Sequence, residues 1–284
     1  MTPLLALATL AAAAPGLFFD DFSQPDLAAL QAAGWTARSE RGHPGVPGGA
    51  WGPGTVQVGG GTLKLVARTD GTPEGTAQAQ LCQQRKFFRG TYAARVRFSD
   101  HPREGAAGDP VIQTFYAVAP LRFPFDPEFS EVDFEYLPNG GWGSPKTRLY
   151  GIAWQTVRIE PWLAYNDPHE AFGSFDGWHV LAVQVAADHT VHFADGQEIA
   201  RAGGRNVPVS PMAISFNHWF SPTGLLAPGT APRVYVEEVD WVMHVTDQLL
   251  TPARVQAKVD EWRQQGTTHL DTMAPATLPG GCNV

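Results

Sequence analysis

Three acidic residues alternate with apolar residues in the segment Glu131-Val132-Asp133-Phe134-Glu135. Successive side chains of a β-strand point to opposite faces, so the three carboxylates share one face, while Val132 and Phe134 share the other. In a helix, the period of 3.6 residues would spread the three acids around the axis. The pattern therefore predicts a strand with a buried apolar back and an acidic front.

A row of carboxylates in a cleft suits the cleavage of a glycosidic bond. Like charges roughly 7 Å apart along a strand repel, and each raises the pKa of its neighbour, so one group keeps a proton beside an ionised partner. A proton donor and a carboxylate in one site are what this reaction requires, and a separation of about 5–5.5 Å between them indicates a retaining mechanism. Acid clusters also bind calcium, and exposed strand faces are often merely solvated, so the spacing alone leaves three interpretations open.

The composition favours a neutral partner for this acidic face. Of the 284 residues, 17% are charged, the formal net charge is −8, and no run of lysine or arginine occurs. Such a chain has no evident surface for nucleic acid or for an anionic membrane. The chain has nine tryptophans and sixteen phenylalanines, and sugars stack on such rings, although most large aromatic side chains belong to cores.

Apolar runs and turn residues predict many short strands. The absence of an alternating strand–helix rhythm favours an all-β fold, a two-sheet antiparallel β-sandwich. Asp195-Gly196 is a typical hairpin turn, and a short helix is expected over 26–33. The expected strands are 18–22, a hairpin within 56–68, 90–98, 111–118, 131–135, 147–156, 178–185, 190–194, 212–219 and 234–245.

The two ends of the chain differ from this central region. Residues 1–14 form an apolar run that resembles a secretory signal peptide and is too short to span a bilayer, although no lysine or arginine precedes it. Residues 15–248 are expected to be the sandwich domain. Thr251 and Pro252 begin a predicted helix that Gly266 ends, and residues 249–284 are this helix and a tail. Export is the expectation, and a cytosolic protein with a chance apolar run is the alternative.

Cys82 and Cys282 are the only cysteines. In an oxidising compartment they can form one bridge that pins the C-terminal tail to the domain, and the alternative is two free thiols. No pair of closely spaced cysteines and no Cys/His cluster indicates zinc.

Residues 16–246 resemble glycoside hydrolase family 16, whose members include laminarinases, lichenases, agarases and xyloglucan transglycosylases. The most specific match is Glu131-Val132-Asp133-Phe134-Glu135, which is similar to the family's E-x-D-x-E signature. The resemblance implies a concanavalin A-like jelly roll. Weaker matches in the same order are Gly90–Val96, Phe175–His179, Ala194–Gly196, Asn217–Trp219 and Val239–Val242.

The resemblance also implies roles for the acids. Glu131 matches the nucleophile, Glu135 the acid/base, and Asp133 the group that hydrogen-bonds to the nucleophile and tunes it. No cofactor is required, but some members hold a structural calcium ion. Asp240 matches one of its ligands, and Asp21 or its neighbour Asp20 is a candidate for another.

The segments 136–143 and 152–165 depart from the lichenase and plant transglycosylase patterns, so the linkage is not predicted. Large aromatic residues and one histidine are candidates for sugar binding, each with a core position as the alternative. His169 and His179 are possible cleft residues, and a structural role is expected for both and for His218. The substrate-binding candidates are Tyr116, Trp142, Trp154, Trp162, His218 and Trp219.

The sequence thus predicts an exported, monomeric, retaining endo-hydrolase of a neutral β-linked polysaccharide or oligosaccharide. A transglycosylase uses the same glycosyl-enzyme and transfers it to a sugar hydroxyl instead of water. A lectin-like module would hold sugar with these acids and perform no chemistry.

Overall fold

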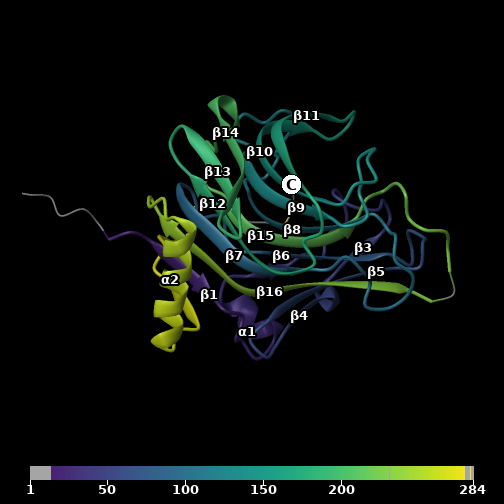
Figure 1. The fold of residues 1–284 in the computed structure, drawn as a ribbon, viewed down its shortest axis with the longest axis horizontal. Coiled ribbons are helices and arrows are strands. Elements are labelled where there is room, and N and C mark those ends of the chain that lie inside the picture. Colours follow the sequence, from purple (N-terminus) through teal and green to yellow (C-terminus); the bar gives the residue numbers. More distant parts are fainter. Residues whose placement is uncertain (1–13, 230, 279–281, 283–284) are drawn as a thin grey trace, which may run out of the picture.

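Two antiparallel β-sheets packed face to face form the body of the molecule, as the sequence predicts (Figure 1). The computed structural model describes residues 14–229, 231–278 and 282. The expected signal segment, 1–14, lies outside the described residues except for Ala14. Among the described residues, no helix combines the length and the apolar character needed to cross a membrane.

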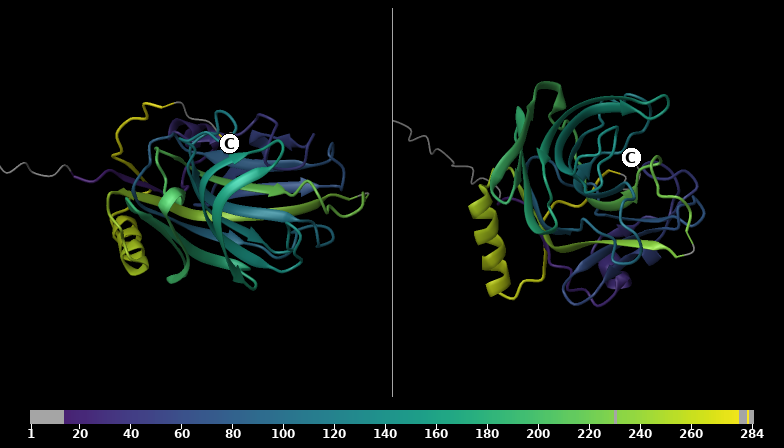
Figure 2. Two further views of the ribbon diagram at one scale, coloured as in Figure 1. Left: turned by 90° about the horizontal axis from the view of Figure 1, so that it is seen from above. Right: turned by 45° about the vertical axis from the view of Figure 1, so that its right-hand side comes forward.

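One sheet is strongly curved and presents its hollow face to solvent (Figure 2). Its strands pair in the spatial order β11-β10-β9-β8-β15-β6-β2. We call it the concave sheet. In the order of pairing, its strands are β11 (Leu163–Phe172), β10 (Arg148–Arg158), β9 (Glu131–Leu137), β8 (Val111–Val118), β15 (Ala213–Phe220), β6 (Ala77–Cys82) and β2 (Thr36–Ala37).

The second sheet, the outer sheet, has the long strand β16 (Arg233–Thr246) at its centre. On one side β16 pairs with β7, and the order continues through β12, β13 and β14; on the other side it pairs with β5 and β1. The other strands are β1 (Leu17–Asp20), β3 (Ala50–Trp51), β4 (Val56–Val58), β5 (Leu63–Thr69), β7 (Gly90–Phe98), β12 (Gly177–Val185), β13 (His189–Ala194), β14 (Gln197–Gly203) and β17 (His269–Asp271).

The core lies between the sheets and includes the apolar face of β9. Val132 and Phe134 are each 1% exposed, and the ring of Phe134 stacks against Phe115 of β8 with centroids 6.1 Å apart. This burial holds β9 flat against the core and leaves its acidic face in the hollow.

Helix α2 (Pro252–Gln264) packs on the outside of the outer sheet, and the helix predicted after Thr251 is thereby confirmed. Its buried face consists of Val255, Val259 and Trp262, and Trp262 lies 5.0 Å from the ring of Phe19. The remaining helical elements are α1 (Leu27–Ala32) and the short 3-10 turns η1 (Pro53–Thr55) and η2 (Gly204–Asn206).

Several strands lie outside the sequence prediction, among them β2, β3, β6, β11 and β17. The segment after α2, expected to be a tail, contributes β17, which pairs with β1. Strand β11 was not predicted, because it is an edge strand of mixed polar and apolar residues, none of them fully buried, and contains Pro168. Cys82, the last residue of β6, is joined to Cys282 by a disulfide.

Candidate active site

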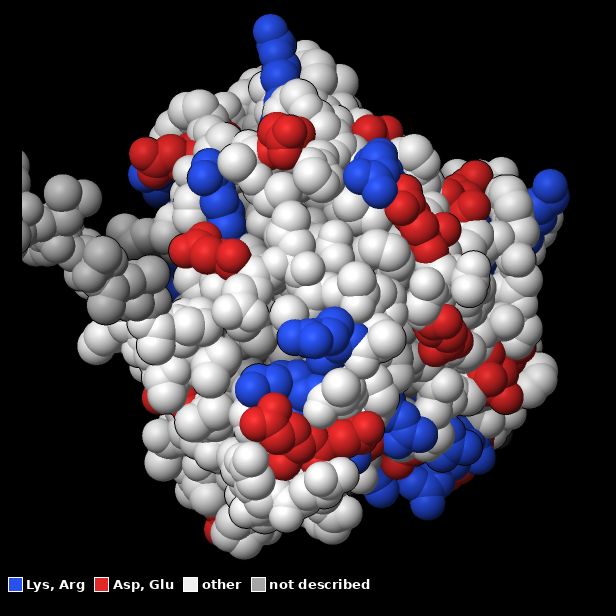
Figure 3. Space-filling model, turned by 60° about the vertical axis from the view of Figure 1, so that its left-hand side comes forward, with Lys and Arg blue, Asp and Glu red and all other residues white. Residues whose placement is uncertain are grey.

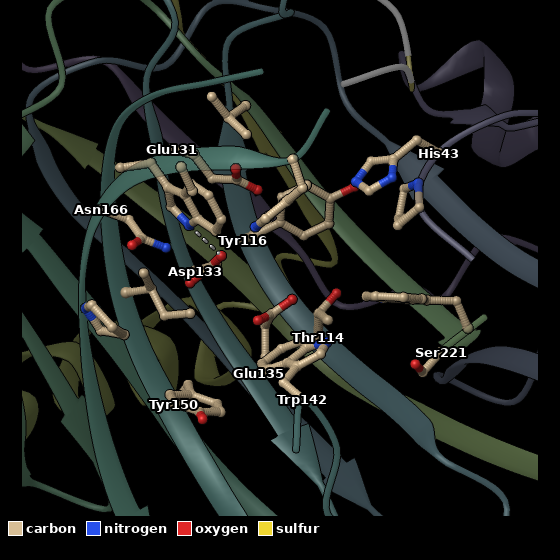
Figure 4. A pocket seen from close by; sticks show the side chains of 18 of the residues that line it. His43, Thr114, Tyr116, Glu131, Asp133, Glu135, Trp142, Tyr150, Asn166 and Ser221 are labelled. Atoms are coloured by element: carbon tan, nitrogen blue, oxygen red, sulfur yellow. Dashed lines mark hydrogen bonds between the residues drawn. The ribbon is translucent and has the colours of Figure 1, made fainter. Parts of the chain in front are cut away.

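The hollow of the concave sheet contains a cavity of about 760 Å³. Its floor is formed by β8, β9, β10 and β15, and the edge strand β11 closes one side. Figure 4 shows Glu131, Asp133 and Glu135, which we call the acidic trio, projecting into this cavity from one strand. The period-2 alternation predicted from the sequence therefore brings all three acids to one site.

Strand register fixes the neighbours of each acid. Asp133 lies opposite Tyr116 of β8 and Ile152 of β10. Directly paired residues of an antiparallel sheet share a face, so the residues paired with the three acids lie on the same face as the acids. Glu131 pairs with Trp154 and Val118, and Glu135 pairs with Tyr150 and Thr114.

Asp133, the central acid, is 3% exposed. Its Oδ2 accepts a hydrogen bond of 3.0 Å from the indole Nε1 of Trp154, while Oδ1 has no partner among the described residues. Burial raises the pKa of Asp133 to about 8, although the Trp154 hydrogen bond opposes this shift by stabilising the ionised form. The carboxyl is therefore mostly protonated at neutral pH.

The outer acids are only partly exposed on the cavity floor. Burial raises the pKa of Glu131, and the neighbouring Asp133 carboxyl adds to the effect. Burial also raises the pKa of Glu135, and the charges of Asp133 and Glu131 raise it further. Because ionising one acid opposes ionising the next, the trio keeps a proton at neutral pH.

Trp154→Phe removes the indole hydrogen bond to Asp133 and keeps an aromatic ring. We expect kcat to fall about ten- to a hundredfold, since a hydrogen bond to a charged group contributes about 1.5–3 kcal/mol. The pH profile of kcat/KM should move to higher pH, because the lost bond stabilised the ionised carboxyl. Trp142→Phe is the matched control, and an equal displacement of its profile would contradict the assignment.

Asp133→Asn tests the raised pKa through stability. The folded-state pKa of about 8 lies above the ordinary value of 3.8, so the folded protein keeps a proton that the unfolded chain releases. Stability is then complete below about pH 4 and declines as the pH rises towards 8. We expect the variant to melt several degrees higher than wild type at pH 8 and to show no gain at pH 4. Asp260→Asn, on an exposed face of α2, should show no such pH-dependent gain.

A buried hydrogen-bond network supports the cavity floor beside the trio. The hydroxyl of Tyr116 accepts from Gln80 Nε2 at 2.6 Å and from Asn217 Nδ2 at 3.2 Å. The Asn217 Oδ1 accepts from the Thr114 hydroxyl at 2.6 Å. Buried, satisfied networks of this kind hold side chains in one arrangement.

Aromatic rings line the cavity around the acidic trio. Trp142 and Trp162 are 49% and 57% exposed, so their rings are available to a ligand. Trp142 packs on Tyr150 with centroids 5.3 Å apart, and Trp162 packs edge-on against Trp154 at 6.3 Å. Trp219 also lines the cavity but is 7% exposed. The structure therefore brings Tyr116, Trp142, Trp154, Trp162 and Trp219 to the trio.

His218 does not belong to this group. It alternates with Asn217 and Trp219 on β15, so its ring points into the core, where it is fully buried and its Nδ1 lies 3.0 Å from the Leu65 carbonyl oxygen. Burial lowers the pKa of His218 to about 4. The sugar-binding prediction for His218 is corrected to a structural role, which is the alternative that the sequence also allowed.

The other two histidine candidates lie away from the cavity lining. His179 Nδ1 lies 2.6 Å from Asp195 Oδ2 on the outer sheet. His169, on β11, lies 3.4 Å from Asp167.

The residues proposed for calcium do not fit that ion. Asp240 is paired with two guanidinium groups, those of Arg95 and Arg263, each at 2.7 Å. Asp21 Oδ1 accepts a hydrogen bond from the Ser23 amide at 3.1 Å. Within the described part of the chain, no three His, Cys, Asp or Glu side chains are arranged to hold a metal. The charge of Asp240 is thus already balanced by two arginines, which makes this side chain a poor ligand for calcium.

Several cavity residues were not predicted. Asn166 comes from the unpredicted strand β11, where it lies opposite Trp154. His43 comes from a loop without periodicity, and its ring lies 5.8 Å from that of Trp162. Asn217 could have been predicted from the sequence, because side chains two residues apart on a strand share a face and Asn217 is two residues before Trp219.

The fold is that of solved endo-glycanases. No protein-family model matches the sequence, and no curated protein sequence matches it. A β-1,3-1,4-glucanase (lichenase) from a mouse hindgut metagenome is similar, at 20% identity over 80% of this chain and 98% of the other, with a TM-score of 0.59. Porphyranase B from Zobellia galactanivorans is 14% identical over 80% of this chain and 90% of the other, with a TM-score of 0.63. The catalytic domain of an endo-1,3-β-glucanase (laminarinase) from Thermotoga petrophila RKU-1 is 14% identical over 81% of this chain and 96% of that domain, with a TM-score of 0.58.

These likenesses establish the jelly-roll sandwich of the glucanases for this chain. The concanavalin A-like fold implied by the sequence resemblance is thereby confirmed.

Proposed function

We propose that the protein is a retaining, endo-acting glycoside hydrolase related to family 16, acting on a neutral β-linked polysaccharide. The observation that carries this proposal is the acidic trio on one strand at the floor of a cavity lined by aromatic rings. A lectin-like module would gain nothing from a proton donor held next to a nucleophile. The endo-glycanases of the same fold support the assignment.

The reaction proceeds in two displacements. Glu135, kept protonated by its raised pKa, donates its proton to the glycosidic oxygen as that bond breaks, while the Glu131 carboxylate bonds to the anomeric carbon. Glu135, now ionised, takes a proton from water, whose oxygen attacks the anomeric carbon and releases Glu131. Asp133 lies between the two and lowers or raises their proton affinity according to its own charge.

The lining argues for an uncharged glycan. None of the described residues that line the cavity is lysine or arginine. Sulfated or uronic sugars would therefore meet acidic carboxyls with no compensating cation. On the surface shown in Figure 3, positive and negative side chains are intermingled, so that face offers no extended field of one sign for a charged polymer.

A substrate panel tests the function. Purified protein is incubated with laminarin, lichenan, xyloglucan, agarose and carrageenan, and the products are identified by mass spectrometry, with anomeric configuration followed by NMR. Cleavage of a neutral glycan to oligosaccharides with retained configuration is expected. Glycan binding without new reducing ends would favour a lectin-like module, and products longer than the substrate would indicate a transglycosylase.

We also infer that the protein is exported and acts as a monomer. The Cys82–Cys282 disulfide supports export, because such bonds persist in oxidising compartments. Sequencing the N-terminus of the mature protein and measuring its mass in solution test these two proposals.

A further inference from the structure

Cys282 is anchored on the face of the concave sheet that carries the acids. The pairing register runs from Cys82 of β6 to Ser215, from Ser215 to Tyr116, and from Tyr116 to Asp133. Directly paired residues share a face, so the side chain of Cys82 lies on the face of the trio. Its disulfide therefore places Cys282 over that face, where Cys282 is 5% exposed.

Gln80 links Cys282 to the cavity floor. Its Nε2 donates to the Cys282 carbonyl oxygen at 2.6 Å and to the Tyr116 hydroxyl at 2.6 Å. Its Oε1 accepts from Arg38 at 2.9 Å. An amide nitrogen has two protons, so these partners use the full donor capacity of Gln80, which is 1% exposed.

Arg38 connects Gln80 to the loop that contains Glu40 and His43, at the cavity wall. Its guanidinium donates to the carbonyl oxygens of Glu40 at 2.7 Å and His43 at 3.1 Å, and it lies over the ring of Trp51 at 4.2 Å. Residues 43–45 of this loop line the cavity. The loop and Cys282 together cover the concave face of β6.

We propose that Cys282, held by its disulfide, closes the β6 end of the groove and limits how many sugar rings the groove binds. This inference rests on the proposed function. Strand β6 lies three strands from β9, about 14 Å at a spacing of about 4.8 Å, which leaves room for a short run of rings on that side of the acids. Releasing Cys282 uncovers β6 and frees a donor of Gln80 for a sugar hydroxyl.

Cys282→Ser tests the proposal against wild type, with oligosaccharides of increasing length prepared from the glycan that the protein cleaves. In wild type, kcat/KM should stop rising at a shorter length than in the variant. The longest substrate should gain about fivefold relative to the shortest, the factor that one added net hydrogen bond of about 1 kcal/mol gives. Because this ratio compares substrates on one protein, a smaller folded fraction does not change it.

Cys82→Ser releases the same anchor and should show the same length dependence. If either variant fails to fold, folded wild type is treated with dithiothreitol, which is oxidised to its cyclic disulfide while Cys82 and Cys282 become thiols. Binding of the same oligosaccharides to Glu131→Gln proteins with and without Cys282→Ser, measured by calorimetry, gives a readout independent of turnover.

The outcomes separate the two proposals. Cleavage with the same length dependence in the anchored and released proteins overturns the closure by Cys282 and leaves the hydrolase assignment intact. If no glycan is cleaved or bound, the proposed function fails and this inference fails with it.

Discussion

Glu131→Gln is expected to lower kcat by about 10⁴-fold or more, because an amide cannot form the glycosyl-enzyme and loss of a nucleophile removes the whole covalent route. The substitution changes one oxygen to NH₂ and leaves Val132 and Phe134 packed as before. Since burial makes an ionised Glu131 unfavourable in the folded protein, the variant should be at least as stable as wild type at neutral pH. The measurement is turnover of the best glycan of the panel, with circular dichroism as the check on folding.

Two further variants sharpen the Glu131 experiment. Glu238→Gln removes an acid of β16 that pairs with Lys64 and Arg97 on the outer sheet, and it should keep wild-type turnover. In Glu131→Ala, added azide should occupy the vacated space and attack the anomeric carbon once, giving a glycosyl azide of inverted configuration. Near-wild-type turnover by a folded Glu131→Gln protein would exclude Glu131 as the nucleophile.

The acidic trio could be predicted because its arrangement depends on local geometry alone. A strand has a period of two whatever surrounds it, so the buried positions of Val132 and Phe134 place the acids on the other face. The same rule applied to β15 separates His218 from Asn217 and Trp219, and it accounts for the structural role of His218.

The walls of the cavity could not be predicted in this way. His43 lines the cavity because Arg38 holds its loop and bonds to Gln80, 42 residues further along the chain than Arg38, and no local pattern encodes that contact. Strand β11 supplies Asn166 although its alternation is weak, since an edge strand in solvent needs no apolar face. The fold class was predictable from many short strands, while the shape of the groove depends on contacts between distant segments.

Burial sets the protonation of the three acids, because it makes their ionised forms unfavourable. The lining lacks cations, so none lowers the pKa values of the three acids, and each is displaced upward by burial. Trp154 is the one described side chain that donates to the trio, and it contacts the central acid. Because ionising one acid opposes ionising the next, the trio holds a proton that can pass between the acids as the reaction alternates between proton donation and proton removal.

Glu135→Gln is expected to lower kcat by about 10²–10⁴-fold on the natural glycan, the usual contribution of a positioned acid/base. The loss should depend on the leaving group. An aryl glycoside departs without a proton, so its first displacement by Glu131 should stay near the wild-type rate, and a burst of phenol should precede a slow steady state. In wild type, burial and two neighbouring acids raise the pKa of Glu135, and activity should fall as the pH rises and Glu135 loses its proton. The activity of Glu135→Gln on the aryl substrate should not fall with pH in this way. An equal loss for aryl and natural substrates, without a burst, would show that Glu135 does not protonate the leaving oxygen.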